Sequence, residues 1–110
     1  MAFFDTREFI RFSADKLAKN NLADTPQLTV DVYCLQPGQQ QKPHAHVGQA
    51  KFYYVIDGQG SFMLGGQARR LGAGGLAFAA AGEEHGVRND STANLVLLVA
   101  IAPSPNLTGV

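Results

Sequence analysis

Three histidines are the side chains best suited to hold a metal ion in this sequence. His44 and His46 are separated by one residue, and His85 lies farther along the chain. Residues two apart on an extended strand face the same way, so this pair has the minimum geometry for two ligands of one metal. Imidazole binds Zn, Fe, Ni, Cu and Mn, so the ligands do not name the metal. The alternative for an isolated His-x-His pair is two solvated loop histidines.

The segments that must position these histidines have the pattern of short strands. From residue 27 onward, apolar runs alternate with Gly, Pro, Asn and Asp, which is typical of an all-β sandwich or barrel. Gly65 and Gly66 predict a tight hairpin, because glycine accepts a positive φ without strain. We expect strands at residues 27–35, 51–56, 61–64, 67–71, 76–80 and 94–102.

The first of these strands alternates apolar and polar residues. Thr29 and Asp31 occupy odd positions, and the even positions carry Leu28, Val30, Val32 and Cys34. This period of two predicts that the even face is the inner one. Cys34 is then a small core residue rather than a nucleophile.

The first 26 residues differ in character from the rest. We expect an edge strand at residues 8–12 and a short helix at residues 14–19, capped by Ser13. The sequence therefore divides into an arm (1–26) packed on a barrel (27–103), followed by a tail (104–110).

Composition limits the classes of function. At 110 residues the chain has room for one domain, and its 9 basic and 9 acidic side chains are balanced, which argues against nucleic-acid binding. A single cysteine predicts a reducing compartment, and the amino-terminal residues do not have the pattern of a secretory signal. No apolar run reaches the length needed to span a membrane. We expect a cytoplasmic protein without a membrane partner.

Two spaced motifs resemble those of the cupin superfamily, in its small single-domain form. The first motif is matched in spacing by Gly38, His44, His46, Lys51 and Gly58. The second is matched by Gly74, Ala80, Gly82, His85 and Asn89, with alanine at position 80 in place of the usual proline. The resemblance implies a double-stranded β-helix, or jelly-roll, barrel in which His44, His46 and His85 bind a divalent transition metal. It also suggests a homodimer.

Lys51 occupies the position at which the first cupin motif has an acidic ligand. An ammonium group is repelled by a divalent cation, and three accounts of it stay open. Its amine turns outward or toward an acidic substrate while Gln49, on the same strand face, supplies a carbonyl oxygen to the metal. Alternatively, it replaces the metal and the histidines bind an anion directly, or it is a desolvated amine nucleophile.

The remaining pocket residues follow from strand parity and composition. Tyr53 shares a face with Lys51 and is the better candidate for a pocket hydroxyl, while Phe62 and Phe78 are expected to form apolar wall or core. Two hypotheses for function follow. One is a metal-dependent oxygenase or isomerase acting on a small organic molecule. The other is a non-catalytic module that binds a sugar or a carboxylate, with Lys51 in the pocket.

Overall fold

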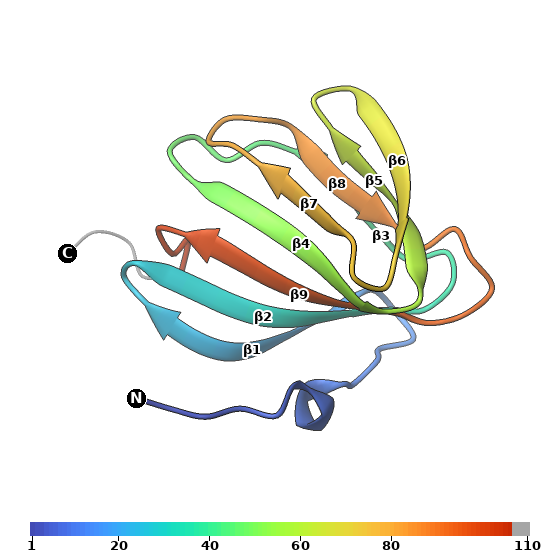
Figure 1. Cartoon of the computed structure of the whole chain (residues 1–110), viewed down its shortest axis with the longest axis horizontal. Helices are drawn as coiled ribbons and strands as arrows, with labels where there is room; N and C mark the ends of the chain where they lie inside the picture. Colours follow the sequence, from blue (N-terminus) through green and yellow to red (C-terminus); the bar gives the residue numbers. More distant parts are fainter. Residues whose placement is uncertain (107–110) are drawn as a thin grey trace.

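The computed structural model describes residues 1–106, which form two antiparallel sheets that face each other (Figure 1). The first sheet has the order β1 (Ala18–Thr25), β2 (Leu28–Leu35), β9 (Leu95–Ala102), β4 (Ala50–Asp57), β7 (Leu76–Ala79). The second has the order β3 (Gln40–His44), β8 (His85–Arg88), β5 (Gln59–Leu64), β6 (Gln67–Gly72). The predicted all-β jelly-roll class is confirmed. Of the predicted tail, residues 107–110 lie outside the described part of the chain.

The strand β9 holds the first sheet together. It pairs with β2 on one side and with β4 on the other, and most of its residues are buried. Its odd positions enter the main core, which fills the space between the two sheets. A strand that is covered on both faces needs apolar residues at both parities, which explains its unbroken apolar sequence.

The hairpin predicted from the two adjacent glycines is present between β5 and β6. Gly65 and Gly66 have φ of 54° and 86°, and the two strands pair directly from Leu64 opposite Gln67. Two successive residues of positive φ match the right-handed twist of the flanking strands. The tight turn therefore places β6 as a regular edge strand of the second sheet.

The inner face of β2 is the opposite of the one predicted. Tyr33 and Leu35 enter the main core, whereas Val32 and Cys34 form a second cluster with Val96 on the outer side. Phe9 and Phe12 from the amino-terminal arm cover this second cluster. Because both faces of β2 are covered, the alternation of apolar residues did not reveal which face lines the barrel.

The amino-terminal elements also differ from the prediction. A 3₁₀ turn at Thr6–Phe9 replaces the expected strand at residues 8–12, and in place of the expected helix at 14–19 residues 14–16 form bends and β1 begins at Ala18. Asn20 on β1 donates from its amide nitrogen to the Phe9 carbonyl at 2.7 Å, which ties the arm to the sheet. Backbone pairing with the open edge of β2 outweighs the weak helical propensity of this segment. No helix in residues 1–106 has both the length and the apolar character needed to cross a membrane.

Candidate metal centre

The structure brings the three histidines together at one end of the barrel. His44 ends β3, His46 follows in the next turn, and His85 begins β8 directly opposite His44 in the strand pairing. One ligand atom from each ring lies within 4.8 Å of the other two. The ring centroids of His44 and His85 are 4.4 Å apart, and those of His44 and His46 are 4.7 Å apart. Antiparallel pairing of β3 with β8 is what joins the two sequence motifs in space.

Backbone carbonyls orient two of the imidazole rings. The Nδ1 atom of His44 lies 2.8 Å from the Lys42 carbonyl oxygen, and Nδ1 of His85 lies 3.0 Å from that of Glu83. A carbonyl oxygen only accepts, so each Nδ1 carries the proton and each Nε2 keeps its lone pair. Metal-binding histidines are commonly held this way, with the second nitrogen fixed by a carbonyl. The donor set and its orientation therefore fit a metal ion.

The burial of His85 is the strongest evidence that a ligand binds at this point. Its side chain is 1% exposed, and its Nε2 atom is buried without a hydrogen-bond partner among the described residues. Burial lowers the pKa of His85 to about 4, although the Glu83 carbonyl opposes the shift. Burial and the neighbouring His44 also lower the pKa of His46. Both rings are neutral at neutral pH, which is the form that binds metal.

Lys51 is buried beside the histidines. It is 2% exposed, its Nζ atom donates to the Gln41 side-chain oxygen at 2.8 Å, and it lies 5.2 Å and 4.8 Å from the ring centres of Tyr33 and Tyr53. The pKa of Lys51 is lowered to about 7, mainly by burial and also by the Lys19 charge, while Asp31 opposes the shift. A cationic donor is thus held next to the candidate metal site, where the usual motif has a carboxylate.

Gln41 connects the polar groups of this end of the barrel, and the sequence analysis did not identify it. Its Oε1 atom accepts from the Tyr53 hydroxyl at 2.6 Å as well as from Lys51, and its side chain shares a hydrogen bond with Tyr33. Burial raises the pKa of Tyr33 to about 12 and raises that of Tyr53 as well, so both hydroxyls stay protonated. The only signal in the sequence is that Gln41 lies on the strand that leads into His44.

A pocket of about 480 Å³ opens over these groups. Its described lining includes three lysines and two histidines: Lys19, Lys42, Lys51, His44 and His46. Among the described lining residues there is no carboxylate. Asp31, the acidic group that acts on Lys51, accepts a hydrogen bond of 2.8 Å from Asn21, and burial raises its pKa. The size suits a small molecule, and the charge suits an anion.

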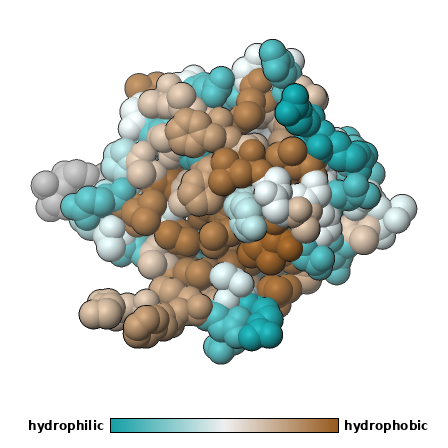
Figure 2. All heavy atoms as spheres, viewed as in Figure 1, coloured by the Kyte–Doolittle hydropathy of each residue, from teal (hydrophilic) through white to brown (hydrophobic). Residues whose placement is uncertain are grey.

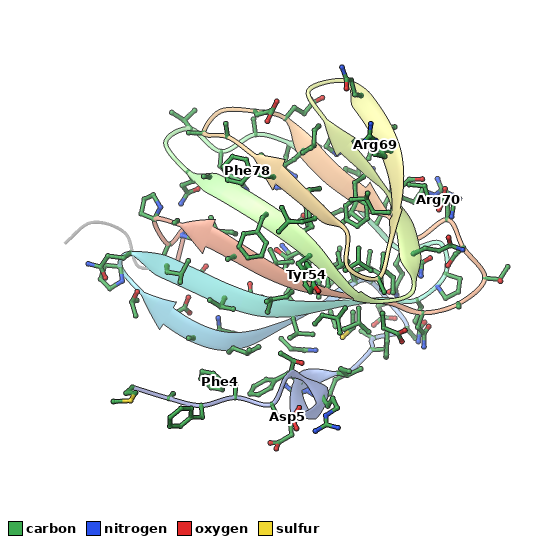
Figure 3. The ribbon with its side chains drawn as sticks, viewed as in Figure 1. Phe4, Asp5, Tyr54, Arg69, Arg70 and Phe78 are labelled. Carbon is green, nitrogen blue, oxygen red and sulfur yellow. The ribbon has the colours of Figure 1, made fainter. Side chains whose placement is uncertain are left out.

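Three predicted site residues lie elsewhere. Gln49 donates its amide nitrogen to the Pro103 carbonyl at 3.0 Å and does not line this pocket. Phe62 belongs to the main core, where its ring centroid lies 5.7 Å from that of Tyr53. Phe78 is 56% exposed on the outer face of β7 (Figure 3) and lines a separate small pocket rather than the one over the histidines.

Strand pairing explains why Phe78 points outward. On β7 the small residues Ala77 and Ala79 face inward, opposite Tyr53 and Lys51 of β4, and both are buried. The long side chains of β4 leave room for only a methyl group there. Phe78 therefore takes the outer face.

The two acidic residues before His85 do not join the histidine cluster. Glu83 and Glu84 are exposed, and Glu83 accepts a hydrogen bond from the Ala80 backbone nitrogen at 3.2 Å across the turn. Among the described residues, the group suited to a metal consists of the three histidines.

Comparison with known proteins identifies relatives over most of the chain. A family model described as "Cupin domain" matches residues 31–101. The chain is 33% identical over 67 residues to a protein from Thermotoga maritima named "Oxalate-binding protein", a match that covers 61% of this chain and 55% of that protein. The chain thus spans about half the length of this curated relative.

Solved structures match nearly the whole chain. The protein TT1209 from Thermus thermophilus has a TM-score of 0.92 and 39% identity, covering 96% of this chain and all (100%) of that one. An uncharacterised conserved protein with a double-stranded β-helix domain from Klebsiella pneumoniae has a TM-score of 0.88 and 26% identity, covering 96% and 92%. The KdgF protein from Halomonas sp., at 22% identity and a TM-score of 0.84, covers 96% of each chain and shares the fold.

Proposed function

The chain belongs to the cupin family, and from this premise we propose that it binds a divalent transition metal through His44, His46 and His85 and acts on a small organic molecule. The observation that carries the proposal is the buried Nε2 atom of His85, which has no hydrogen-bond partner among the described residues. A buried polar atom without a partner costs about 1–3 kcal/mol unless a ligand satisfies it. A metal shared with the other two histidines is the ligand that supplies this.

The bound metal, one of Fe, Mn, Ni, Cu or Zn, would supply Lewis-acid or oxygen-activating chemistry. This makes an oxygenase or an isomerase the class of enzyme that the donor set favours. The protein groups around it bind and orient the substrate: Lys51 donates from its buried amine, and Tyr53 donates from a hydroxyl whose pKa burial raises. The apolar core behind Tyr53 keeps water from that side of the site.

Elemental analysis tests the metal assignment. Protein purified without added metal or chelator is compared with His44→Ala and His85→Ala. We expect near-stoichiometric transition metal in the wild type and loss of it in both variants. Glu84→Gln is the matched control, because this carboxylate adjoins His85 in sequence but is exposed. Unchanged metal content in His44→Ala would contradict the assignment.

A non-catalytic binding module is the second candidate, favoured by Lys51 in the position of the usual acidic ligand. A fixed cation among the pocket residues suits a carboxylate or an acidic sugar. The relative named as an oxalate-binding protein supports a small ligand of this type. Thermal stabilisation by such a ligand after metal removal with a neutral chelator would favour this candidate, and stabilisation by metal alone would favour the enzyme.

We further propose that the protein is a homodimer formed through the outer face of the first sheet. Large apolar side chains are exposed there, including Leu28, Tyr54, Leu76 and Phe78. Figure 2 shows apolar residues gathered over this region of the molecule. A self-complementary apolar face is the usual basis of a two-fold interface. Light scattering that gives the monomer mass at micromolar concentration would rule out this assembly.

A cytoplasmic location is proposed on the cysteine chemistry. Cys34 is the single cysteine of the sequence, and its thiol is buried and free. A protein without disulfides is suited to a reducing compartment. Cell fractionation with a specific antibody checks this location.

A further inference from the structure

One oxygen atom of the pocket lining accepts hydrogen bonds from two buried donors, of which Lys51 lines the pocket and Tyr53 lies behind the lining. Oε1 of Gln41 accepts from Lys51 Nζ at 2.8 Å and from the Tyr53 hydroxyl at 2.6 Å. Both donors are at most 2% exposed. An amide oxygen has two lone pairs, and here both are used. The two donors therefore define a site for one acceptor oxygen, which the chain fills with its own side chain.

This acceptor is poorly matched to the charge of its partners. The amide of Gln41 is neutral, so it satisfies the Lys51 hydrogen bond without balancing the buried ammonium. Asp31 favours the charged form of Lys51, but it accepts a hydrogen bond from Asn21 and does not line the pocket. Lys19 and Lys42 add further positive charge at the pocket mouth. The described lining therefore holds three lysines and no carboxylate, and a bound carboxylate would pair with Lys51 and favour its charged form.

Gln41 also has space into which it can move. Its side chain lines the pocket over the histidines and a second pocket of about 560 Å³, formed on the other side by the amino-terminal segment. Gln41 and Lys19 are the described residues common to both linings. The Gln41 side chain therefore stands between two open volumes, and a rotation toward Ser13 and Leu17 would clear the donors without unfolding a strand.

We propose that Lys51 and Tyr53 form a carboxylate-binding subsite whose resident acceptor is the Gln41 side chain, and that a small organic acid displaces Gln41 when it binds. This inference rests on the proposed function in one respect, since it places the ligand in the pocket beside the histidines. It identifies the ligand class as a carboxylic acid and assigns Gln41 as a gate. The second carboxylate or carbonyl oxygen of such an acid would extend toward the histidines.

Calorimetric titration of the full chain with malonate, against its neutral analogue malonamide, tests the subsite. Metal is first removed with 1,10-phenanthroline, a chelator without a carboxylate, and the metal content of each sample is measured. We expect malonate to bind and malonamide not to bind. Lys51→Met should weaken malonate at least about tenfold, as removal of a hydrogen bond to a charged group does. Arg69→Met is the control: this exposed cation on β6 lies outside the pocket lining and should change the affinity by less than about threefold.

Gln41→Ala distinguishes a gate from a positioning residue. If the ligand displaces Gln41, removal of the side chain frees the donors and tightens malonate binding about two- to tenfold. If Gln41 instead holds Lys51 in place for the ligand, the same variant weakens binding, and the proposal is overturned. Equal binding of malonate and malonamide would also overturn it.

Two further readouts keep the outcomes separate. If Lys51→Met does not fold, Tyr53→Phe removes the other donor while it keeps the buried ring, and it should weaken malonate severalfold; an unchanged affinity would contradict the subsite. Loss of the metal assignment would show as absent metal in the wild type, whereas failure of the subsite would show as absent malonate binding in protein of known metal content.

Discussion

The two ends of the barrel interior share the strands β2 and β4 but have opposite chemistry. At one end β2, β4 and β9 contribute aliphatic side chains that are fully buried: Leu35, Val55, Leu95 and Leu97. At the other end β2, β4 and β8 contribute polar side chains that are just as inaccessible: Thr29, Lys51, Tyr53 and His85. The apolar end is packed, and the buried Asn89 amide beside it is satisfied by the Leu35 and Ala93 carbonyls. The polar end keeps an imidazole nitrogen without a partner among the described residues and a buried amine held by a neutral amide.

This difference indicates which end was selected for stability and which for binding. Replacing a buried charged group by an apolar one of similar volume often leaves stability unchanged or increases it. A sequence that keeps His85 and Lys51 at buried positions therefore gives up stability there. Places where a chain departs from its own packing rules are commonly functional sites. The polar end of the barrel is such a place.

The largest effect is expected at the apolar end. Leu97→Ala removes a fully buried side chain at the centre of β9 and should lower the free energy of unfolding by about 2–5 kcal/mol. Metal content per folded molecule should not change, because Leu97 lies away from the histidines. Denaturant unfolding and elemental analysis check the two parts. If Leu97→Ala lost as much metal as His44→Ala, the proposed separation between a stabilising end and a metal-binding end would be wrong.

Removal of the buried ammonium should act in the opposite direction. Lys51→Met should raise the free energy of unfolding at pH 7 by about 1–4 kcal/mol, because it replaces a buried charge by an apolar chain of similar length. Lys19→Met, at an exposed position, should change it by less than about 0.5 kcal/mol. A large destabilisation by Lys51→Met would mean that Lys51 supports the fold rather than a ligand.

The same lysine predicts an unusual pH dependence. Burial lowers the pKa of Lys51 from its ordinary 10.5 to about 7 in the folded chain. Between these values the unfolded chain binds more protons, so stability should rise with pH by up to about 1.4 kcal/mol per unit. Unfolding curves of the wild type and Lys51→Met from pH 7 to 10 test this. The slope should flatten in the variant, and equal slopes would contradict the assignment.

A smaller effect is expected on the acidic side. Burial lowers the folded pKa of His85 from 6.5 to about 4, so the unfolded chain binds the extra proton in that window. Stability of the metal-free protein should therefore fall as pH decreases from 6.5 to 4. His85→Gln should reduce this fall by about 1–3 kcal/mol over the window, measured by urea unfolding. If wild type and variant lose stability in parallel, other groups cause the effect.

The smallest effect on the folded monomer is expected outside the barrel. Phe78 is exposed on β7, so Phe78→Ser should change monomer stability by less than about 0.5 kcal/mol. If the outer face forms the dimer, the same variant should shift the assembly toward monomer in sedimentation velocity runs. Arg69→Ser, on the exposed strand β6, is the control. A dimer that resists Phe78→Ser would place the interface elsewhere.

Six of the nine strands in the described residues and the histidine cluster were predictable, because their signals are local or repeated. Gly65 and Gly66 specify a turn by their own conformational freedom, and β9 is apolar at both parities. Two motifs of fixed spacing linked His44 with His85 before any pairing was known. The structure then explains the link, because β3 and β8 pair with these residues opposite each other.

The parts that were not predicted depend on contacts between distant segments. The inner face of β2 could not be identified, because the arm residues Phe9 and Phe12 bury its other face. Gln41 lies in a polar segment and gains its role only when Lys51 and Tyr53 fold against it. Phe78 lies on the outer face of β7, away from the histidines, because its small neighbours Ala77 and Ala79 face the long side chains of β4. None of these contacts leaves a periodic signal in the sequence.

Stabilisation of the protein by added metal tests the central claim most directly. Thermal unfolding is followed for wild type and His44→Ala, first freed of metal with 1,10-phenanthroline and then titrated with Zn or Mn. His44 is only half-buried, so the variant should fold. The account predicts that the wild type gains about 2.7 kcal/mol at a metal concentration one hundred times Kd, and that His44→Ala gains much less. An equal gain in both proteins, or none in the wild type, would contradict a metal site built from the three histidines.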